Sequence, residues 1–179
     1  MTKFMFKIVL IGDGAVGKTS IRRRYMGEGF ETDFLATMGA DFAYLENKLN
    51  ENKIKWQIWD LAGQPAFRNV MRAYFKGSMG ALAVYDVSQP KTLEGIDSWI
   101  QEAQFHAETF PELPVVIVGN KIDLRDEIPN CVKTINGFIK AKSLNAEFIE
   151  TSAKTGENIP DAFTKLAHQI ISKTSLEIK

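Results

Sequence analysis

The chain has 179 residues, of which 45% are apolar, and its 22 Lys and Arg residues balance its 22 Asp and Glu residues. This length and apolar share fit one globular domain, residues 1–179, with a sizeable core. The zero net charge gives no reason to expect nucleic acid or a strongly anionic membrane as a partner. A single cysteine, Cys131, excludes an intrachain disulfide framework and suits a reducing compartment.

The two ends of the sequence carry no recognisable targeting signal. There is no signal peptide and no apolar run long enough to span a bilayer. Thr2 stands where N-myristoylation needs a glycine, and the last residues hold no cysteine to prenylate. We expect a cytoplasmic protein with no membrane anchor in this chain, and a monomer by default. Peripheral membrane association would need a lipidated tail or a partner protein.

The first predicted strand, residues 3–11, leads into a glycine-rich segment that reads G-D-G-A-V-G-K-T and opens a helix. This spacing is typical of a phosphate-binding loop, in which glycines let backbone N–H groups converge on phosphate oxygens. The N-terminal end of the helix adds its positive dipole. A turn that binds nothing would match this pattern by chance in about one chain in a hundred. A nucleoside triphosphate is therefore the expected ligand.

The side chains at the end of this segment supply the chemistry. Lys18 can reach the β- and γ-phosphates as a point charge, and the hydroxyl of Thr19 is a hard ligand that suits Mg²⁺. The helix is predicted to run to about Met26, and its basic run over residues 22–24 is expected to be solvated surface. The residues expected to bind nucleotide here are Gly12, Asp13, Gly14, Ala15, Val16, Gly17, Lys18, Thr19 and Ser20.

Two strands are predicted next, after a loop over residues 30–38. They cover about 40–49 and 53–61 and form a hairpin, because the residues between them favour a turn. In the second strand, apolar residues alternate with polar ones, so one face is predicted to be buried and Trp59 falls on the other.

The remaining elements alternate between helix and strand. After an irregular segment over 62–69 they are a short helix to about residue 76, a strand over 81–86, a helix over 88–107, a strand over 115–118, a helix over 131–142, a strand over 147–150 and a helix over 159–171. This alternation predicts an α/β fold with a mostly parallel sheet covered on both faces. Ligands of such folds bind beyond the carboxyl ends of the strands.

Polar residues follow the second hairpin strand at such a carboxyl end. Asp60 can hold the hydration shell of a magnesium ion, and Gly63 lets its backbone N–H approach a γ-phosphate. Gln64 can orient an attacking water molecule. These residues add a metal ligand and a catalytic group to the phosphate site.

Two further strand ends predict which base is bound. Ionised Asp123 is an acceptor, and guanine presents N1–H and N2–H₂ donors side by side, whereas adenine has no donor at N1. Asn120 and the backbone N–H of Ala153 can add contacts to the base, and the stems of Lys121 and Lys154 can pack on its faces. Ser152 completes the second segment, T-S-A-K. Alone, the pattern N-K-x-D is weak, but it becomes specific beside a phosphate loop.

These motifs together resemble a small GTPase of the Ras superfamily over nearly the whole chain. The resemblance implies a P-loop G domain with a six-stranded, mostly parallel sheet and five helices, and GTP or GDP bound with Mg²⁺. It also implies switch loops near residues 30–40 and 61–76. By position, Phe30 would stack on guanine and Thr37 would be the magnesium ligand that senses the γ-phosphate. The implied metal ligands are Thr19, Thr37 and Asp60, and the implied catalytic residues are Gln64, Lys18 and Thr37.

Within the superfamily the chain most resembles Rab proteins. Residues 37–42 are similar to their switch I signature, and Trp59-Asp60 with residues 72–77 is similar to their switch II region. Phe42, Trp59 and Tyr74 match the aromatic triad that Rabs present to effectors, and core packing is the alternative for these side chains. The phosphate loop is closer to that of Rho proteins, but the interval from Asp123 to Ser152 is too short for the extra Rho helix.

The two residues after Gln64 depart from the Rab pattern, as does Leu61, which stands where the family usually has threonine. Pro65 and Ala66 follow Gln64 where Rabs usually have Glu and Arg. Because proline restricts the residue before it, our hypothesis is that unassisted hydrolysis is slow and that ordinary exchange factors engage poorly. Phe34 stands three residues before Thr37, where an arginine in cis would stabilise the transition state, so a partner's arginine is expected to accelerate hydrolysis.

The resulting prediction is a GTP/GDP molecular switch that hydrolyses GTP slowly. Its expected partners are effectors, exchange factors and GTPase-activating proteins. Two alternatives remain at this point. One is a GTP-bound scaffold with little intrinsic hydrolysis, which only Pro65 supports. The other is an ordinary P-loop ATPase or kinase.

Overall fold

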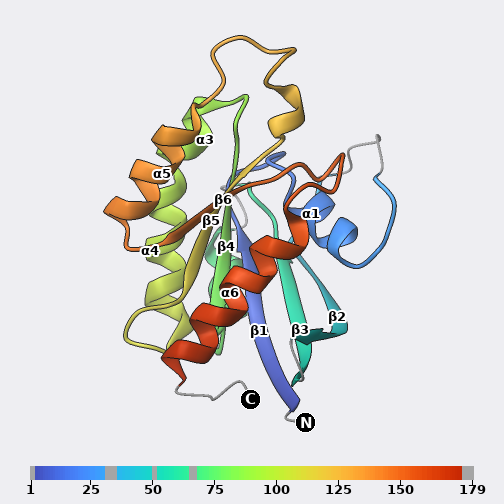
Figure 1. The fold of residues 1–179 in the computed structure, drawn as a ribbon. Coiled ribbons are helices and arrows are strands. Elements are labelled where there is room, and N and C mark those ends of the chain that lie inside the picture. The colour runs from blue at the N-terminus through green and yellow to red at the C-terminus, as the bar shows by residue number, and fades with distance from the viewer. Residues whose placement is uncertain (1–2, 31–35, 50–51, 65–67, 175–179) are drawn as a thin grey trace.

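Figure 1 shows the computed structural model, which describes residues 3–30, 36–49, 52–64 and 68–174. In these ranges six strands form one sheet in the order β2-β3-β1-β4-β5-β6. They are β1 (Lys3–Ile11), β2 (Ala40–Leu49), β3 (Asn52–Leu61), β4 (Gly80–Asp86), β5 (Val115–Asn120) and β6 (Glu147–Glu150). β2 and β3 pair antiparallel, and the other neighbours pair in parallel. The predicted mostly parallel α/β sheet is confirmed.

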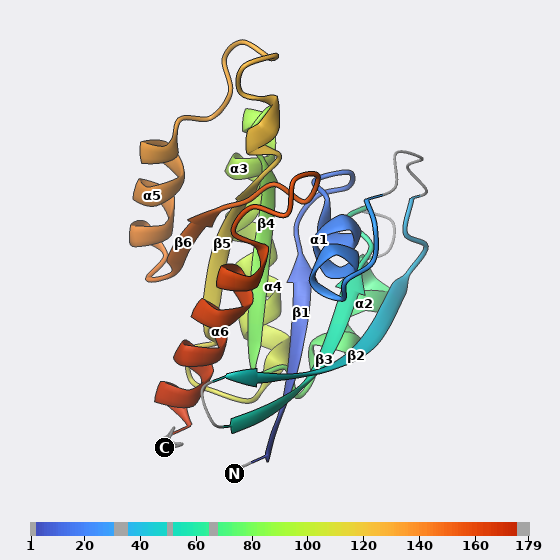
Figure 2. The same cartoon turned by 45° about the vertical axis from the view of Figure 1, so that its right-hand side comes forward.

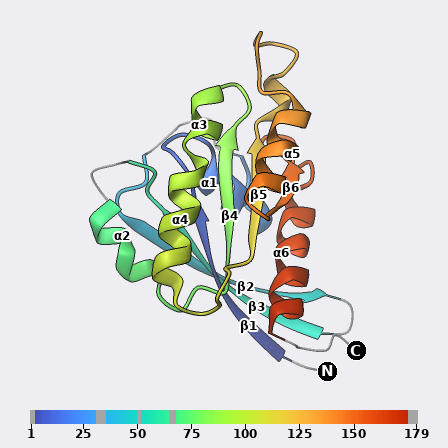
Figure 3. The same cartoon turned by 90° about the vertical axis from the view of Figure 1, so that its left-hand side faces the viewer.

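Helices cover both faces of this sheet (Figure 2; Figure 3). α1 (Lys18–Tyr25) and α6 (Ile159–Lys173) lie on one face. The other face carries α2 (Arg68–Phe75), α3 (Pro90–Glu94), α4 (Ile96–Ala107) and α5 (Thr134–Ser143). Within the described residues, α3 and α4 follow each other around Gly95 and correspond to one predicted helix, which gives the five helices expected.

The period of two along each strand sends its apolar side chains to two cores. In β1, Phe6, Ile8 and Leu10 join the cluster under α1 and α6, whereas Val9 and Ile11 join the cluster on the opposite face. All five side chains are at most 1% exposed. A strand buried on both faces explains why this segment reads as a nearly continuous apolar run.

Two helix boundaries differ from the sequence prediction. α5 begins at Thr134 rather than at Cys131, because the backbone of Lys133 is still extended and the N–H of Val132 donates to the carbonyl of Val87 at 2.7 Å. The helix predicted over 88–107 is interrupted at Gly95. A Cβ on Gly95 would lie 3.3 Å from a carboxylate oxygen of Asp13, so glycine lets this turn pass close to the phosphate loop.

The parallel strands place their carboxyl ends at one edge of the sheet. β1 and β3 run in parallel, as do β4, β5 and β6, so the segments that follow these strands gather at that edge. The segment after β1 leads directly into α1 (Figure 2). None of the helices in the described ranges is both long and apolar enough to cross a membrane.

Candidate functional site

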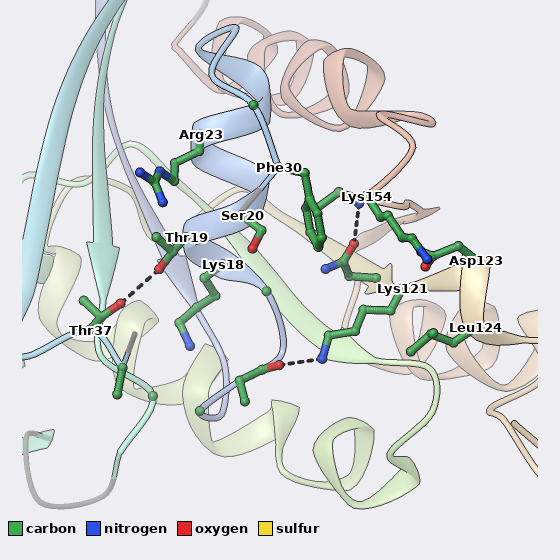
Figure 4. A pocket seen from close by; sticks show the side chains of 18 of the residues that line it. Lys18, Thr19, Ser20, Arg23, Phe30, Thr37, Lys121, Asp123, Leu124 and Lys154 are labelled. Carbon is green, nitrogen blue, oxygen red and sulfur yellow. Dashed lines mark hydrogen bonds between the residues drawn. The ribbon is translucent and has the colours of Figure 1, made fainter. Parts of the chain in front are cut away.

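A cavity of about 720 Å³ opens at this edge of the sheet. This volume is typical of a pocket that holds a nucleotide-sized ligand. Figure 4 shows Lys18, Thr19 and Thr37 at one end of the cavity and Phe30, Lys121, Asp123 and Lys154 at the other. The predicted residues that line it are Gly14, Ala15, Gly17, Lys18, Thr19, Ser20, Phe30, Thr37, Gly63, Gln64, Asn120, Lys121, Asp123, Ala153 and Lys154.

Five of the residues predicted to bind nucleotide or metal do not line the cavity, but each forms a hydrogen bond with a residue that does. They are Gly12, Asp13, Val16, Asp60 and Ser152. Val16, for example, is 1% exposed and packs in the core under α1. The carboxylate of Asp13 accepts a hydrogen bond from Nε1 of Trp99 at 2.8 Å, which ties the phosphate loop to α4.

The glycines of the phosphate loop are required by close packing. Gly17 has a φ of 100°, and a Cβ there would lie 2.3 Å from Nδ2 of Asn120. Gly12 has a φ of 134°, and a Cβ there would lie 2.1 Å from the carbonyl oxygen of Val84. The loop therefore rests directly on the ends of β4 and β5, as the motif predicts.

Lys18 places a buried ammonium group at the end of the cavity where phosphate is predicted to bind, which we call the phosphate end. The side chain is buried, and Nζ donates to the carbonyls of Gly12 at 2.7 Å and Asp13 at 2.6 Å. Burial lowers the pKa of Lys18 to about 8, although the charges of Asp60 and Asp13 act in the opposite direction. A buried cation beside an open cavity favours an anionic ligand.

Three oxygen-bearing side chains converge next to Lys18. Oγ1 of Thr19 lies 2.9 Å from Oγ1 of Thr37 and donates to Oδ2 of Asp60 at 2.5 Å. Asp60 is fully buried, and its Oδ1 has no hydrogen-bond partner among the described residues. Burial raises the pKa of Asp60, while the Thr19 hydroxyl and the charge of Lys18 lower it. Hard oxygen ligands with one unpaired carboxylate oxygen fit a magnesium ion and its water shell.

The opposite end of the cavity, where a base is predicted to bind and which we call the base end, is held by side chains that join three loops. Asn120 donates from Nδ2 to the carbonyl of Val16 at 3.0 Å, and its Oδ1 accepts from Oγ1 of Thr151 at 3.0 Å and from the N–H of Ala153 at 3.2 Å. Asp123 accepts from Oγ of Ser152 at 2.5 Å. Asn120 and the Ala153 N–H, which we expected to face the base, are therefore bonded to each other in this structure.

Lys121 braces the same region. Its Nζ donates to the carbonyl of Ala15 at 2.7 Å and pairs with Oδ2 of Asp86 at 2.6 Å. Asp86, which the sequence placed only as the end of a strand, also accepts from the backbone N–H and the hydroxyl of Ser88. Asp86 thus fixes the lysine whose stem lines the cavity.

The basic run at residues 22–24 is not simply solvated surface, and that expectation is wrong. Arg22 is buried and pairs with Asp41 at 2.8 Å. Arg24 donates from Nε to the carbonyl of Ala153 at 2.9 Å and from Nη2 to the carbonyl of Lys154. Arg23 lies at the cavity wall. The available signal was helical spacing, since Arg22 follows Lys18 by four residues and so shares its face of α1.

The three aromatic residues predicted as an effector surface form a continuous row. The ring centroids of Phe42 and Trp59 are 5.1 Å apart, and those of Trp59 and Tyr74 are also 5.1 Å apart. Phe42 is 49% exposed. Trp59 and Tyr74 are half-buried and pack against the core cluster under α2 and α4. The row is therefore packed against the core at Trp59 and Tyr74 and exposed to solvent at Phe42.

Three residues behind the sequence hypotheses lie outside the described residues. They are Phe34, Pro65 and Ala66. Gln64 is described and is exposed at the cavity wall. Gly63 lies against the phosphate loop, since a Cβ there would be 2.2 Å from the carbonyl carbon of Asp13.

Comparison with known proteins identifies the family to which this chain belongs. The sequence model of the Ras family matches residues 7–172. The chain belongs to the Ras family. Ras-related protein Rab-8B of Homo sapiens is 39% identical over 170 residues, which cover 95% of this chain and 80% of that protein.

Two more relatives show the breadth of the match. Ras-related protein Rab-8A of Gallus gallus is 39% identical over 176 residues, covering 98% of this chain and 83% of that protein. Ras-related protein RABA1b of Arabidopsis thaliana is 40% identical over 172 residues, covering 96% of this chain and 78% of that protein. This is a Rab-like small GTPase, an enzyme that hydrolyses GTP.

Proposed function

We propose that this Rab-like GTPase is a molecular switch that binds GTP or GDP together with Mg²⁺ and signals its nucleotide state through two switch loops. The observation that carries the proposal is the layout of one cavity. Lys18, Thr19 and Thr37 lie at one end of it and Asp123 at the other. A triphosphate and a guanine base need these two sets of groups at opposite ends of one ligand.

Each end of the ligand has its own recognition chemistry. Asp123 accepts from the N1–H and N2–H₂ groups of guanine, and Ser152 holds that carboxylate in place. Phe30, 42% exposed at the cavity wall, stacks on the base. Lys18, whose Nζ lies at the phosphate loop, supplies a positive charge to the β- and γ-phosphates.

The hydrolytic step depends on Gln64 and on the charge held around the γ-phosphate. The side chain of Gln64 orients a water molecule, whose oxygen attacks the γ-phosphorus as the bond to the β-γ bridging oxygen breaks. GDP leaves with the bridging oxygen, and the proton of the water passes to an oxygen of the transferred phosphate. Lys18 and the loop N–H groups stabilise the negative charge that develops on the phosphate oxygens. Thr19, Thr37 and, through water, Asp60 would hold Mg²⁺, which supplies a further positive charge at those oxygens.

Loss of the γ-phosphate changes what the switch residues can contact. Thr37 and Gly63 approach the phosphate end from the two switch segments, so both lose a partner on hydrolysis. Effectors that contact Phe42, Trp59 and Tyr74 then distinguish the two states. Exchange factors and GTPase-activating proteins set the balance between them, and the GTPase itself acts as a monomer.

An alternative is a GTP-bound scaffold with little intrinsic hydrolysis. The sequence feature that favours it is Pro65 directly after Gln64. Single-turnover phosphate release from wild type and from Gln64→Leu separates the two functions. A slower rate in the variant supports the switch, whereas equal rates support the scaffold.

Base specificity gives the decisive test. Asp123→Asn should weaken GTP binding by about 10²-fold or more and gain xanthosine triphosphate, because an amide can donate to the C2 oxygen of xanthine. Asp126→Asn, a change at an exposed carboxylate three residues further along, is the matched control and should leave both affinities unchanged. Equal binding of ATP and GTP by wild type would instead support an ordinary P-loop ATPase.

A further inference from the structure

Arg22 occupies an unusual place beside the candidate magnesium site. It lies on α1, one helical turn after Lys18, and only 10% of its side chain is exposed. Its Nη2 is 2.8 Å from Oδ2 of Asp41 at the start of β2, and its Nε is 4.0 Å from Oδ2 of Asp60. Nε has no hydrogen-bond partner among the described residues. The guanidinium therefore lies between a switch I strand and the buried carboxylate.

The charge of this guanidinium is permanent. Arginine stays protonated in proteins, so Arg22 cannot lose its charge when a cation binds next to it. Asp41 is 59% exposed and pairs with one side of the guanidinium, which leaves the charge on the Asp60 side only partly compensated. Charges about 4 Å apart interact strongly near a protein surface. Arg22 thus attracts the same carboxylate that a magnesium ion needs.

We propose that Arg22 weakens magnesium binding by placing a fixed positive charge beside Asp60, so that it sets the Mg²⁺ concentration at which nucleotide is retained. The inference rests on the proposed function, because it concerns the same metal-assisted nucleotide site. When Mg²⁺ is scarce, Arg22 compensates the charge of Asp60. When Mg²⁺ binds, it does so against the repulsion of a fixed positive charge.

Two substitutions change the local charge in opposite directions. Arg22→Met removes the positive charge while keeping a long apolar side chain in a buried position. Asp41→Asn leaves Arg22 in place and removes the negative charge that partly compensates it. We therefore expect Arg22→Met to strengthen and Asp41→Asn to weaken magnesium binding. A loss of packing alone would not produce opposite signs.

The test measures release of a fluorescent GDP analogue from the full chain over a range of free Mg²⁺ concentrations. Arg22→Met should lower the Mg²⁺ concentration for half-maximal retention by roughly tenfold, and Asp41→Asn should raise it by roughly threefold. Arg22→Lys keeps the charge and should stay close to wild type. Arg24→Met, which removes a brace from the base end, should change the release rate by the same factor at every Mg²⁺ concentration.

The outcomes separate the inference from the function on which it rests. Overlapping Mg²⁺ curves for wild type, Arg22→Met and Asp41→Asn would overturn the inference while leaving GDP binding intact. No binding of the GDP analogue by wild type would overturn the proposed function itself. If Arg22→Met does not fold, as circular dichroism would reveal, Asp41→Asn and Arg22→Lys decide, and an unchanged midpoint in Asp41→Asn overturns the inference.

Discussion

The base end and the phosphate end of the cavity differ in what holds them together. At the base end, Asn120, Lys121 and Arg24 bond to backbone carbonyls of other loops, so protein groups satisfy one another. At the phosphate end, Oδ1 of Asp60 has no partner among the described residues, and Lys18 is a buried charge held by two carbonyls. Protein groups therefore satisfy the base end, whereas the phosphate end keeps polar groups that a bound ligand would satisfy.

This contrast suits a switch. A rigid base end can discriminate guanine from adenine whatever the phosphate state, because unpaired polar groups penalise the wrong base. At the phosphate end, polar groups of the protein lack hydrogen-bond partners, and phosphate oxygens of the ligand can supply them. The conformation there should therefore depend strongly on the number of phosphates. Under the proposed function, the base and the number of phosphates are therefore recognised at separate places in one cavity.

The largest expected effect comes from removing the buried charge at the phosphate end. Lys18→Met should weaken GDP binding by about 10³-fold or more, because a charge-assisted contact to phosphate is lost. The free energy of unfolding of the nucleotide-free protein should not fall, since burying the ammonium group is itself unfavourable.

Fluorescence titration with labelled GDP and urea unfolding measure these two quantities. Lys7→Met is the matched control, because Lys7 lies on β1 away from the cavity, and it should bind GDP like wild type. GDP binding by Lys18→Met within tenfold of wild type would contradict the assignment of the phosphate end.

Two glycine substitutions compare the rigidity of the two ends directly. Gly17→Ala places a Cβ 2.3 Å from Asn120 in a segment with a φ of 100°, so it should cost about 3 kcal/mol of unfolding free energy. Gly63→Ala places a Cβ 2.2 Å from Asp13, but its segment is expected to move away, so the cost should be about 1 kcal/mol or less.

Denaturant unfolding of the nucleotide-free variants measures this difference, and Gly14→Ala, where a Cβ meets nothing within 4 Å, is the control. Equal losses at Gly17 and Gly63 would mean that both ends are equally rigid. Gly63→Ala should still slow GTP hydrolysis, because the segment that carries Gln64 is displaced.

The same contrast explains what the sequence predicts. The base and phosphate motifs were visible because their chemistry depends on residue type at fixed spacing, as for Asp123 and Lys18. The structural roles of Arg22 and Arg24 could not be predicted, because a buried arginine and a solvated arginine look alike in a basic run. Arg22 and Arg24 acquire their partners only through contacts between residues far apart in the chain, such as Arg24 with Ala153.

The sheet was predictable for a similar reason. A strand buried on both faces reads as an apolar run, which located β1, β4 and β5. The start of α5 was not predictable, because the N–H of Val132 bonds to the carbonyl of Val87, which lies in a distant segment. Tertiary contacts of this kind override local propensity at element ends.

The smallest expected effect is the uptake of a proton when the nucleotide binds. Burial lowers the pKa of Lys18 from 10.5 to about 8 in the nucleotide-free protein, and a polyphosphate beside Nζ should raise it again. Because the bound pKa is higher, the contribution of Lys18 to affinity is complete below pH 8 and is lost as the pH rises through 8 toward the bound value. GDP affinity should therefore fall by up to about tenfold per pH unit above pH 8.

Calorimetry at pH 8.5, where guanine keeps its N1 proton, measures the proton directly. The binding enthalpy should vary with the ionisation enthalpy of the buffer, with uptake of roughly half a proton or more per GDP. At pH 7 the same comparison should show little uptake from Lys18, because its amine is already protonated in both states. A binding enthalpy independent of buffer at pH 8.5 would mean that the phosphate end is already electrostatically satisfied without its ligand, and the contrast with the base end would disappear.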